Sequence, residues 1–230
     1  YFLLMFINNF DPVAFNILSL EIRWYSLSYI FGIILGWLYC KRKLINEDKY
    51  KNLFDDYIFY LVLGIIIGGR IGYILFYNLE YYLNNFSEIF QIWKGGMSFH
   101  GALLGIIFTV IIFSKKHKIN EFIFLDLIAV SAPIGIFFGR VANFINGELV
   151  GKTTNVYWGV VFPNIDNLTR HPSQLYEAIL EGIILFILLN WIYFRPNYKT
   201  GTCSFMFLIF YGVFRVLSEF FREPDIQIGY

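Results

Sequence analysis

The sequence predicts an all-α polytopic membrane protein with six transmembrane helices and a small cap on the outer face. Of the 230 residues, 57% are apolar and only 15% are charged, whereas about 25% of a soluble domain is charged. The mean hydropathy is +0.58. Six stretches approach the length of about 20 apolar residues that crosses a bilayer as a helix. These features exclude an ordinary soluble domain and a disordered chain, and the net charge of +1 excludes a nucleic-acid-binding footprint.

The expected spans follow one another with connectors whose cations set their orientation. They cover residues 17–40, 56–78, 97–114, 121–140, 174–194 and 201–221. Connectors one, three and five carry ten cations, namely Lys41, Arg42, Lys43, Lys49, Lys51, Lys115, Lys116, Lys118, Arg195 and Lys199. The other two carry three, namely Lys94, Lys152 and Arg170. Because cytoplasmic loops hold the excess of Lys and Arg, the N-terminus is predicted to lie outside.

The two outer connectors have structure of their own. Residues 80–96 are typical of an amphipathic or re-entrant segment at the membrane interface. Residues 141–172 combine Pro, Gly and Asn with short β-prone pieces, which predicts a cap loop within one membrane domain covering residues 1–230. The chain begins with Tyr1, upstream of the more natural start Met5, and stops in a polar stretch, so we expect a fragment at its C-terminus.

Ionisable residues inside the predicted spans gather in their outer halves. Such residues are costly in a membrane and are functional-site hypotheses by default. With the predicted topology, nearly all of them lie toward the outer leaflet, namely Glu21, Arg23, Arg70, His100, Arg140, Glu177, Glu181, Arg215, Glu219 and Arg222. Asp126, in the inner half of the fourth span, is the exception. This distribution predicts one polar cavity that opens toward the outer leaflet.

The last span carries a polar face. Tyr211, Arg215, Glu219 and Arg222 are spaced by 4, 4 and 3 residues, which places them on one side of a helix. For Arg215 and Glu219 alone, a ladder that merely pins helices together is an equal alternative. Adding Arg140 and Arg70 at similar depth predicts an excess of guanidinium groups that requires an anion. Arginine suits phosphate because it binds it bidentately and stays charged, so a lipid phosphate is the expected ligand.

Two further segments carry candidate residues. His100 lies in GGMSFHGALLG at a helix start, where the helix dipole favours a neutral imidazole that can accept a proton. A histidine hydrogen-bonded to the backbone is the alternative. Residues 139–151, GRVANFINGELVG, are dense in hydrogen-bonding side chains, or form a capped helix end followed by a turn. Cys40 and Cys203 lack metal-ligand spacing, and we predict no metal and no cofactor.

Together these segments resemble the prolipoprotein diacylglyceryl transferase family of bacterial inner membranes. The matching pieces follow the family's order over nearly the whole chain. They are RWYSLSYIFG (23–32), GGRIGY (68–73), GGMSFHGALLG (95–105), GRVANFINGELVG (139–151), RHPSQLYEA (170–178), YGVFRVLSEFFREPD (211–225) and the closing IQIG. The combination of GRxxNFINGE with FREPD is highly specific. Family members have a seventh span after this point, which we expect to be missing from this chain.

The resemblance implies an enzyme that moves the sn-1,2-diacylglyceryl group of phosphatidylglycerol onto the lipobox cysteine of a prolipoprotein, beside its signal peptide. The products are a thioether and glycerol phosphate. It also implies a multi-pass protein of the inner membrane whose active site faces the outer leaflet. Arg140 matches the family's arginine that binds phosphatidylglycerol, and Arg215 matches the second arginine of the site. The other residues that match functional positions are Asn143, Glu148, Gly151, Tyr211, Glu219, Arg222, His100 and Tyr25.

The residue types fit this reaction. Two guanidinium groups, on Arg140 and Arg215, would stabilise the charge that develops on a leaving phosphate monoester. A thiolate is a better nucleophile than a thiol, so His100 is the expected proton acceptor, with nearby carboxylates or Tyr211 as alternatives.

Three other functions compete with the transferase. A non-catalytic protein that binds or transports anionic lipid needs a polar lining toward the inner leaflet as well. A different lipid enzyme needs clustered metal ligands or a Ser–His pair. In a purely structural subunit the charges would pin subunits together, and equal numbers of buried arginines and acids would suit this role.

Overall fold

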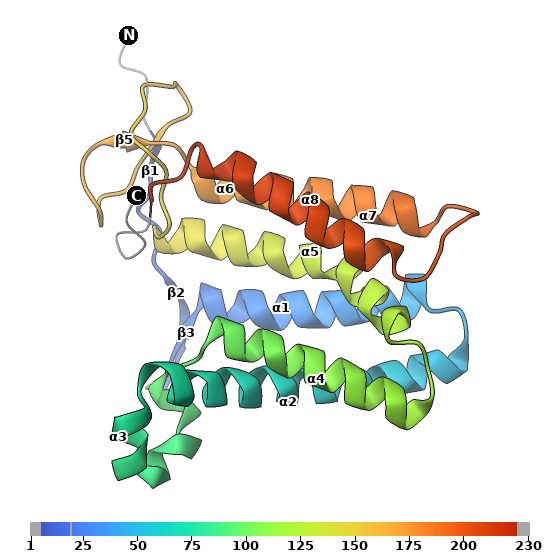
Figure 1. The fold of residues 1–230 in the computed structure, drawn as a ribbon. Coiled ribbons are helices and arrows are strands. Elements are labelled where there is room, and N and C mark those ends of the chain that lie inside the picture. The colour runs from blue at the N-terminus through green and yellow to red at the C-terminus, as the bar shows by residue number, and fades with distance from the viewer. Residues whose placement is uncertain (1–5, 19, 225–230) are drawn as a thin grey trace. The chain divides into compact units, whose positions relative to one another are not determined.

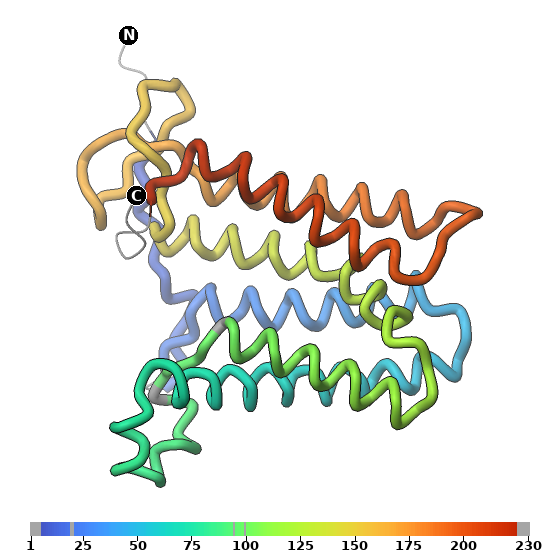
Figure 2. Tube along the Cα trace, in the orientation of Figure 1, coloured from blue at the N-terminus to red at the C-terminus, as the bar shows by residue number. Residues whose placement is uncertain are grey.

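The computed structural model describes residues 6–18 and 20–224 (Figures 1 and 2). Our expectations about Met5 and the IQIG motif lie outside these residues. The chain is mostly helical and divides into two compact units, one made of Tyr1–Cys40 and Asp126–Tyr230, the other of Lys41–Leu125. Each unit is a bundle of apolar helices.

Helices α1, α5 and α8 and one composite helix form the first unit. Helix α1 covers Trp24–Tyr39, α5 covers Glu121–Asn146 and α8 covers Thr202–Glu219. The composite helix joins α6 (Ser173–Glu177), the π-helical segment η4 (Ala178–Ile184) and α7 (Leu185–Tyr193) without a break, and α8 packs along it (Figure 1). A Cβ on Gly32 would lie 2.7 Å from the Gly135 Cα, so glycine lets α1 and α5 approach closely.

A β-hairpin precedes α1, which corrects the expected first span of 17–40. Strand β2 (Val13–Ile17) pairs antiparallel with β3 (Leu20–Arg23), and the helix begins only at Trp24. Apolar Phe15, Ile17 and Ile22 alternate with polar Asn16 and Glu21. This period of two is a strand signature that total hydropathy conceals. The fold is therefore not purely α-helical.

The expected cap loop folds around a small sheet. Strand β4 (Val160–Val161) lies between β5 (Thr169–Arg170), which is antiparallel to it, and β1 (Phe6–Ile7), which is parallel to it. Buried Phe144, Val150, Val160 and Phe162 form a hydrophobic core that includes strand β4. This core attaches the cap to the end of α5, where several candidate residues lie.

The second unit pairs two long helices. Helix α2 (Asp48–Tyr77) packs on α4 (Phe99–His117). The chain that connects them forms α3 (Leu79–Asn84) and the short turns η2 (Phe86–Phe90) and η3 (Ile92–Lys94). A Cβ on Gly68 would lie 2.8 Å from the Gly105 Cα and would meet the Gly101 carbonyl. Small residues therefore set the close α2–α4 contact, as in membrane helix pairs. The π-helical segment η1 (Cys40–Leu44) joins the two units in sequence.

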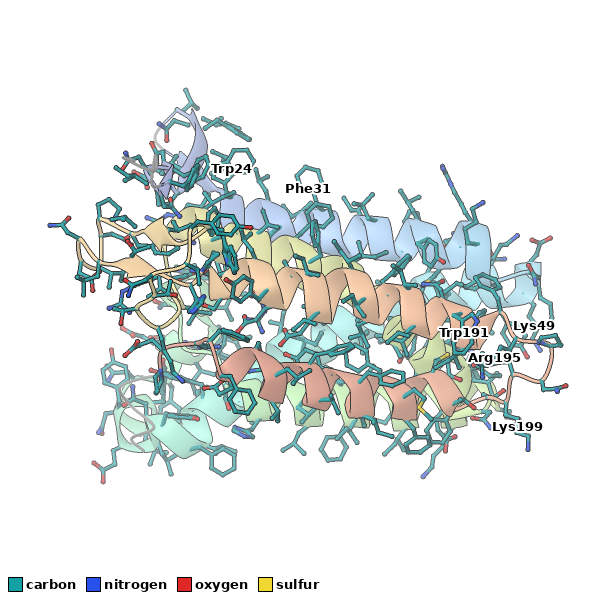
Figure 3. The ribbon with its side chains drawn as sticks, turned by 90° about the horizontal axis from the view of Figure 1, so that it is seen from above. Trp24, Phe31, Lys49, Trp191, Arg195 and Lys199 are labelled. Carbon is teal, nitrogen blue, oxygen red and sulfur yellow. The ribbon has the colours of Figure 1, made fainter. Side chains whose placement is uncertain are left out.

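The helices suit a membrane. Among the described residues, Asp48–Tyr77, Glu121–Asn146, Ser173–Tyr193 and Thr202–Glu219 are long and apolar enough to cross a bilayer. Helices α1 and α4, with 16 and 19 residues, cover the other two expected spans, so six crossings stay a prediction. Trp24 and Phe31 on α1 are 41% and 48% exposed, and Arg195 stacks on Trp191 with 3.4 Å between its guanidinium carbon and the ring centroid (Figure 3). Exposed aromatic side chains of this kind suit lipid and the membrane interface.

Candidate active site

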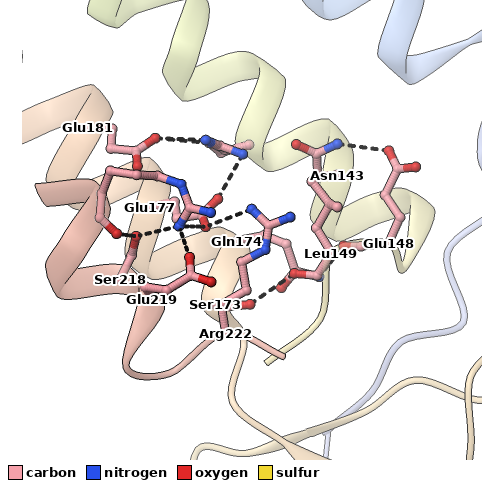
Figure 4. Close-up of polar contacts among 12 residues, drawn as sticks. Asn143, Glu148, Leu149, Ser173, Gln174, Glu177, Glu181, Ser218, Glu219 and Arg222 are labelled. Carbon is pink, nitrogen blue, oxygen red and sulfur yellow. Dashed lines mark hydrogen bonds and ion pairs between the residues drawn. The ribbon is translucent and has the colours of Figure 1, made fainter. Parts of the chain in front are cut away.

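The candidate site of the first unit begins with Arg140, in the last turns of α5. Its guanidinium group lies 2.8 Å from a Glu177 carboxylate oxygen and 2.9 Å from one of Glu181 (Figure 4). Both glutamate side chains are fully buried, and Arg140 is 16% exposed. An ion pair in such surroundings is stable only when the geometry is good, and breaking it leaves an uncompensated charge.

The two glutamates lie on an irregular part of the composite helix. Glu177 ends α6, and Glu181 lies within the π-helical segment η4. A π-helical turn shifts the register of the residues that follow it and is frequent at functional sites. The spacing of four residues places both carboxylates on one face of this helix, toward the same arginine.

Helix α8 and the residues after it supply two more arginines. The Nη1 atoms of Arg215 and Arg222 lie 3.8 and 3.6 Å from Glu177 Oε1, so Glu177 contacts three arginines. Arg215 also forms a close ion pair with Glu219, one helical turn later. We call Arg140, Arg215, Arg222, Glu177, Glu181 and Glu219 the arginine–glutamate cluster. It contains three cations and three anions.

The expected excess of guanidinium groups is therefore wrong. Arg70, which the sequence suggested as a further member, lies in the second unit and is 4% exposed. It donates hydrogen bonds to the carbonyls of Glu88, Ile89 and Gly95 at 2.6, 2.8 and 2.6 Å. Its guanidinium group also lies over the Tyr82 ring. Arg70 holds the η2–η3 segment in place through neutral partners within its own unit.

Beside the cluster, the turn after α5 is held by side-chain amides. Asn143 Nδ2 donates to Glu148 Oε1 at 2.8 Å, and Gln174 Nε2 donates to the Glu148 backbone carbonyl at 2.6 Å (Figure 4). Ser173 Oγ donates to the Leu149 carbonyl at 3.0 Å. These bonds connect the end of α5 to the start of α6. Both Asn143 and Glu148 are thereby fixed at the C-terminal end of α5, the helix that carries Arg140.

Gly151 lies where three backbone segments meet. Its N–H donates to the His171 carbonyl at 3.1 Å, and it pairs with Arg222 in an isolated β-bridge. A Cβ here would lie 2.7 Å from the Phe221 carbonyl oxygen and would collide with the His171 carbonyl. Glycine is needed because the backbones approach so closely. Gly151 thus positions Arg222, which contacts Glu177.

Arg170 links the cap to the backbone around Gly151. Its guanidinium group pairs with Asp166 at 2.6 Å and with Glu223 at 3.3 Å, and it donates to the Gly151 carbonyl at 3.0 Å. The hydrogen bonds from Arg170 hold the pKa of the Asp166 carboxyl below its ordinary value. Residues 220–223, which follow α8, are thereby attached to the cap.

The remaining candidates divide between the units. Tyr211 contacts Arg140 from α8, and Tyr25 accepts a hydrogen bond from Tyr29 at 2.9 Å on α1. His100 is the second residue of α4, in the second unit, after the N-cap residue Ser98. The first unit therefore holds every predicted site residue except His100 and Arg70.

Comparison with known proteins identifies the family. The family model described as prolipoprotein diacylglyceryl transferase matches residues 12–230. The chain belongs to this family. Similar proteins named phosphatidylglycerol–prolipoprotein diacylglyceryl transferase include those of Rickettsia bellii (strain OSU 85-389), 49% identical, Ehrlichia ruminantium (strain Welgevonden), 50% identical, and Ehrlichia canis (strain Jake), 52% identical. The alignments cover 96% of this chain and 86%, 87% and 85% of these relatives.

The sequence reasoning left Glu177, Glu181 and Gln174 out of the transferase site. All three are fully buried and either hold Arg140 or brace the turn that carries Glu148. Their spacing of 3 and 4 residues on one apolar helix was the available signal, because it places three polar groups on one face. Counting intramembrane charges identified the two glutamates but not their arginine partner.

Asp126, the one intramembrane acid expected toward the inner leaflet, has a different role. Its buried carboxylate accepts hydrogen bonds from the Gly201 N–H at 2.5 Å, from the Ser204 N–H at 2.7 Å and from the Tyr198 hydroxyl. It thus satisfies N–H groups at the start of α8, as a capping residue does. A carboxylate with these partners holds a helix in place.

Proposed function

We propose that this chain transfers the sn-1,2-diacylglyceryl group of phosphatidylglycerol to the lipobox cysteine thiol of prolipoproteins, the first step of lipoprotein maturation. The observation that carries the proposal is the arginine–glutamate cluster in a member of this family. Arg140 and Arg215 offer guanidinium groups from two different helices, held by a buried carboxylate that both contact. Such a pair suits the phosphate of an anionic lipid.

The reaction follows from the substrate's bonds. The thiol sulfur attacks the glycerol carbon of the diacylglyceryl group that carries the phosphate, forming a thioether. The carbon–oxygen bond to phosphate breaks, and glycerol phosphate leaves with the bonding electrons. Arg140 and Arg215 stabilise the charge on this leaving group, an effect worth about 10²–10³ in rate for one well-placed donor. The nucleophile belongs to the substrate, so no cysteine of the enzyme takes part.

Other residues orient these groups and handle the proton. Glu177 and Glu181 hold the Arg140 guanidinium group through ion pairs, while Asn143 and Glu148 are fixed to each other at the end of the same helix. In this proposal His100 accepts the thiol proton, since an imidazole is a common general base. Tyr25 and Gly151 complete the predicted lipid site. Tyr25 offers its hydroxyl as a hydrogen-bonding group, and Gly151 positions Arg222.

The site faces the outer leaflet in this proposal. Six helices cross the bacterial inner membrane, with the N-terminus and the cap in the periplasm, because the cations concentrate on connectors one, three and five.

One observation favours a second function, a structural subunit. The cluster has equal numbers of arginines and glutamates, as ion pairs that only pin helices would have. Against this reading, Arg215 and Glu219 are 31% and 49% exposed, so one edge of the cluster is open to a ligand. Transport of lipid is disfavoured, because the inner acid Asp126 caps a helix.

Mass spectrometry of a lipobox peptide tests the transferase function. The protein in membranes is given phosphatidylglycerol with labelled acyl chains, and the mass added to the peptide's cysteine is measured. We expect a diacylglyceryl adduct from the natural chain and from the control Arg195→Ala, whose arginine stacks on Trp191. We expect at least about a hundredfold less from Arg140→Ala. A folded chain that binds phosphatidylglycerol and forms no adduct would overturn the proposal in favour of lipid binding alone.

A further inference from the structure

The arginine–glutamate cluster has a closed side and an open side. On the closed side, Glu177 and Glu181 are fully buried and Arg140 is 16% exposed. On the open side, Arg215 is 31% and Glu219 49% exposed. Apart from its ion pairs, Glu177 has no hydrogen-bond partner for either oxygen among the described residues. The open side is therefore where an anion from the membrane meets the cluster.

The charge balance restricts how an anion can bind there. Three carboxylates already neutralise three guanidinium groups, so a phosphate that joined them would add an unpaired negative charge. Uncompensated charge in partly apolar surroundings is strongly disfavoured. A bound phosphate must therefore take the place of one carboxylate.

Glu219 is the carboxylate that can leave. Glu177 contacts three arginines and has no access to water, and Glu181 pairs with Arg140 through both Nε and Nη2. Glu219 instead ends α8, and in the described part of the chain its one ionic partner is Arg215. A half-exposed pair of this kind contributes about 1 kcal/mol or less, because water solvates each partner once they separate.

We propose that Glu219 competes with the substrate phosphate for Arg215. In the empty site Glu219 holds the guanidinium group; the phosphate of the lipid displaces it, and Glu219 returns as glycerol phosphate departs. Glu219 is thus a positioning residue that limits affinity and speeds product release. This inference rests on the proposed function, because it assumes a phosphate ligand.

Substituting the carboxylate by an amide separates this role from substrate binding. Glu219→Gln keeps the size and the polar contacts of the side chain but removes the competing charge. If Glu219 competes with phosphate, the variant binds glycerol phosphate more tightly, and both KM and kcat fall. If Glu219 instead binds the lipid, the variant binds it more weakly and KM rises. A merely structural role would lower activity without tightening the binding of any anion.

The experiment measures inhibition of peptide lipidation by added sn-glycerol 1-phosphate. We expect the inhibition constant of Glu219→Gln to be about three to ten times lower than that of the natural chain. Asp55→Asn is the control, since its carboxylate is also partly exposed (42%) and paired with a cation, Lys41. The inhibition constant of this variant should not change. An unchanged or higher constant in Glu219→Gln overturns the proposal.

A second variant and a second readout keep the test decisive. Glu219→Asp retains the charge on a shorter side chain, so it should lower the inhibition constant by a smaller factor. If the glutamine variant does not fold, the aspartate variant decides alone, and no decrease counts against the proposal. Stabilisation of the purified protein against heat by glycerol phosphate measures binding without turnover. This readout still tests the competition if the natural chain forms no adduct, which is the failure of the proposed function.

Discussion

Arg70 and Arg140 are both largely buried arginines on long apolar helices, but different partners satisfy them. Arg70 donates to backbone carbonyls, which are neutral and belong to one short segment. Arg140 pairs with two carboxylates, inside a cluster with an open edge. The carbonyl partners of Arg70 tie one short segment to α2, and we expect this arginine to act in the fold. The carboxylate partners of Arg140 place it in a cluster whose exposed edge, at Arg215 and Glu219, is where a phosphate can enter.

The same substitution at both positions tests this comparison and should have the largest effect. In Arg140→Lys, one ammonium group replaces the planar guanidinium group and cannot bind a phosphate bidentately. Lipidation should therefore fall about a hundredfold while the chain still folds. In Arg70→Lys, the ammonium cannot reach carbonyls from Glu88 to Gly95 at once. Stability should then fall by about 2–4 kcal/mol, because buried acceptors lose their donors.

Activity and unfolding are measured on the same samples. Thermal unfolding in detergent gives the stability, and lipidation is expressed per folded molecule. Arg70→Lys should keep lipidation within about threefold of the natural chain once folding is accounted for. If it loses as much activity as Arg140→Lys, Arg70 belongs to the active site and the distinction between carbonyl and carboxylate partners fails.

Gly151→Ala sharpens the comparison by moving a cluster residue through the backbone. The new Cβ would collide with the His171 carbonyl and lie 2.7 Å from the Phe221 carbonyl oxygen. Residues 220–223 must then shift, which carries Arg222 away from Glu177. Lipidation should fall about tenfold or more, with a stability loss of about 1–3 kcal/mol.

Gly212→Ala on α8 is the control for this substitution. A Cβ at Gly212 meets nothing within 4 Å, so the change adds a methyl group without a collision. Lipidation by this variant should stay near that of the natural chain. Equal losses in the two variants would mean that the backbone contact of Gly151 has no particular role in placing Arg222.

The sequence predicted the helices better than it predicted the pairing of charges. Hydropathy alone located α2, α4, α5, α6–α7 and α8, and most of their ends lie within a few residues of the expected ones. This is because the length of an apolar stretch is the main sequence signal of a membrane helix. It failed at 13–23, because a two-residue period in a short apolar stretch is easily absorbed into a longer span. It also placed Arg70 with Arg140, because depth in a span says nothing about partners. Partners such as the Glu88 carbonyl become visible only when distant segments are folded together.

The smallest effect is expected at the cap, from Asp166. Its pKa is lowered in the folded chain by hydrogen bonds from Arg170. A lowered pKa means that the carboxylate stabilises the fold above its unfolded pKa, about 3.9, and that this contribution is lost as the pH falls through the lower folded value. The cap should therefore loosen below about pH 4, and Asp166→Asn should remove that part of the pH dependence. Thermal unfolding between pH 3 and 7 measures both, with Asp48→Asn, an exposed acid paired with Lys51 in the second unit, as the control. If the natural chain and Asp166→Asn differ as much at pH 3 as at pH 7, the pair with Arg170 adds no pH-dependent stability, and the attachment of residues 220–223 rests on the Gly151 junction instead.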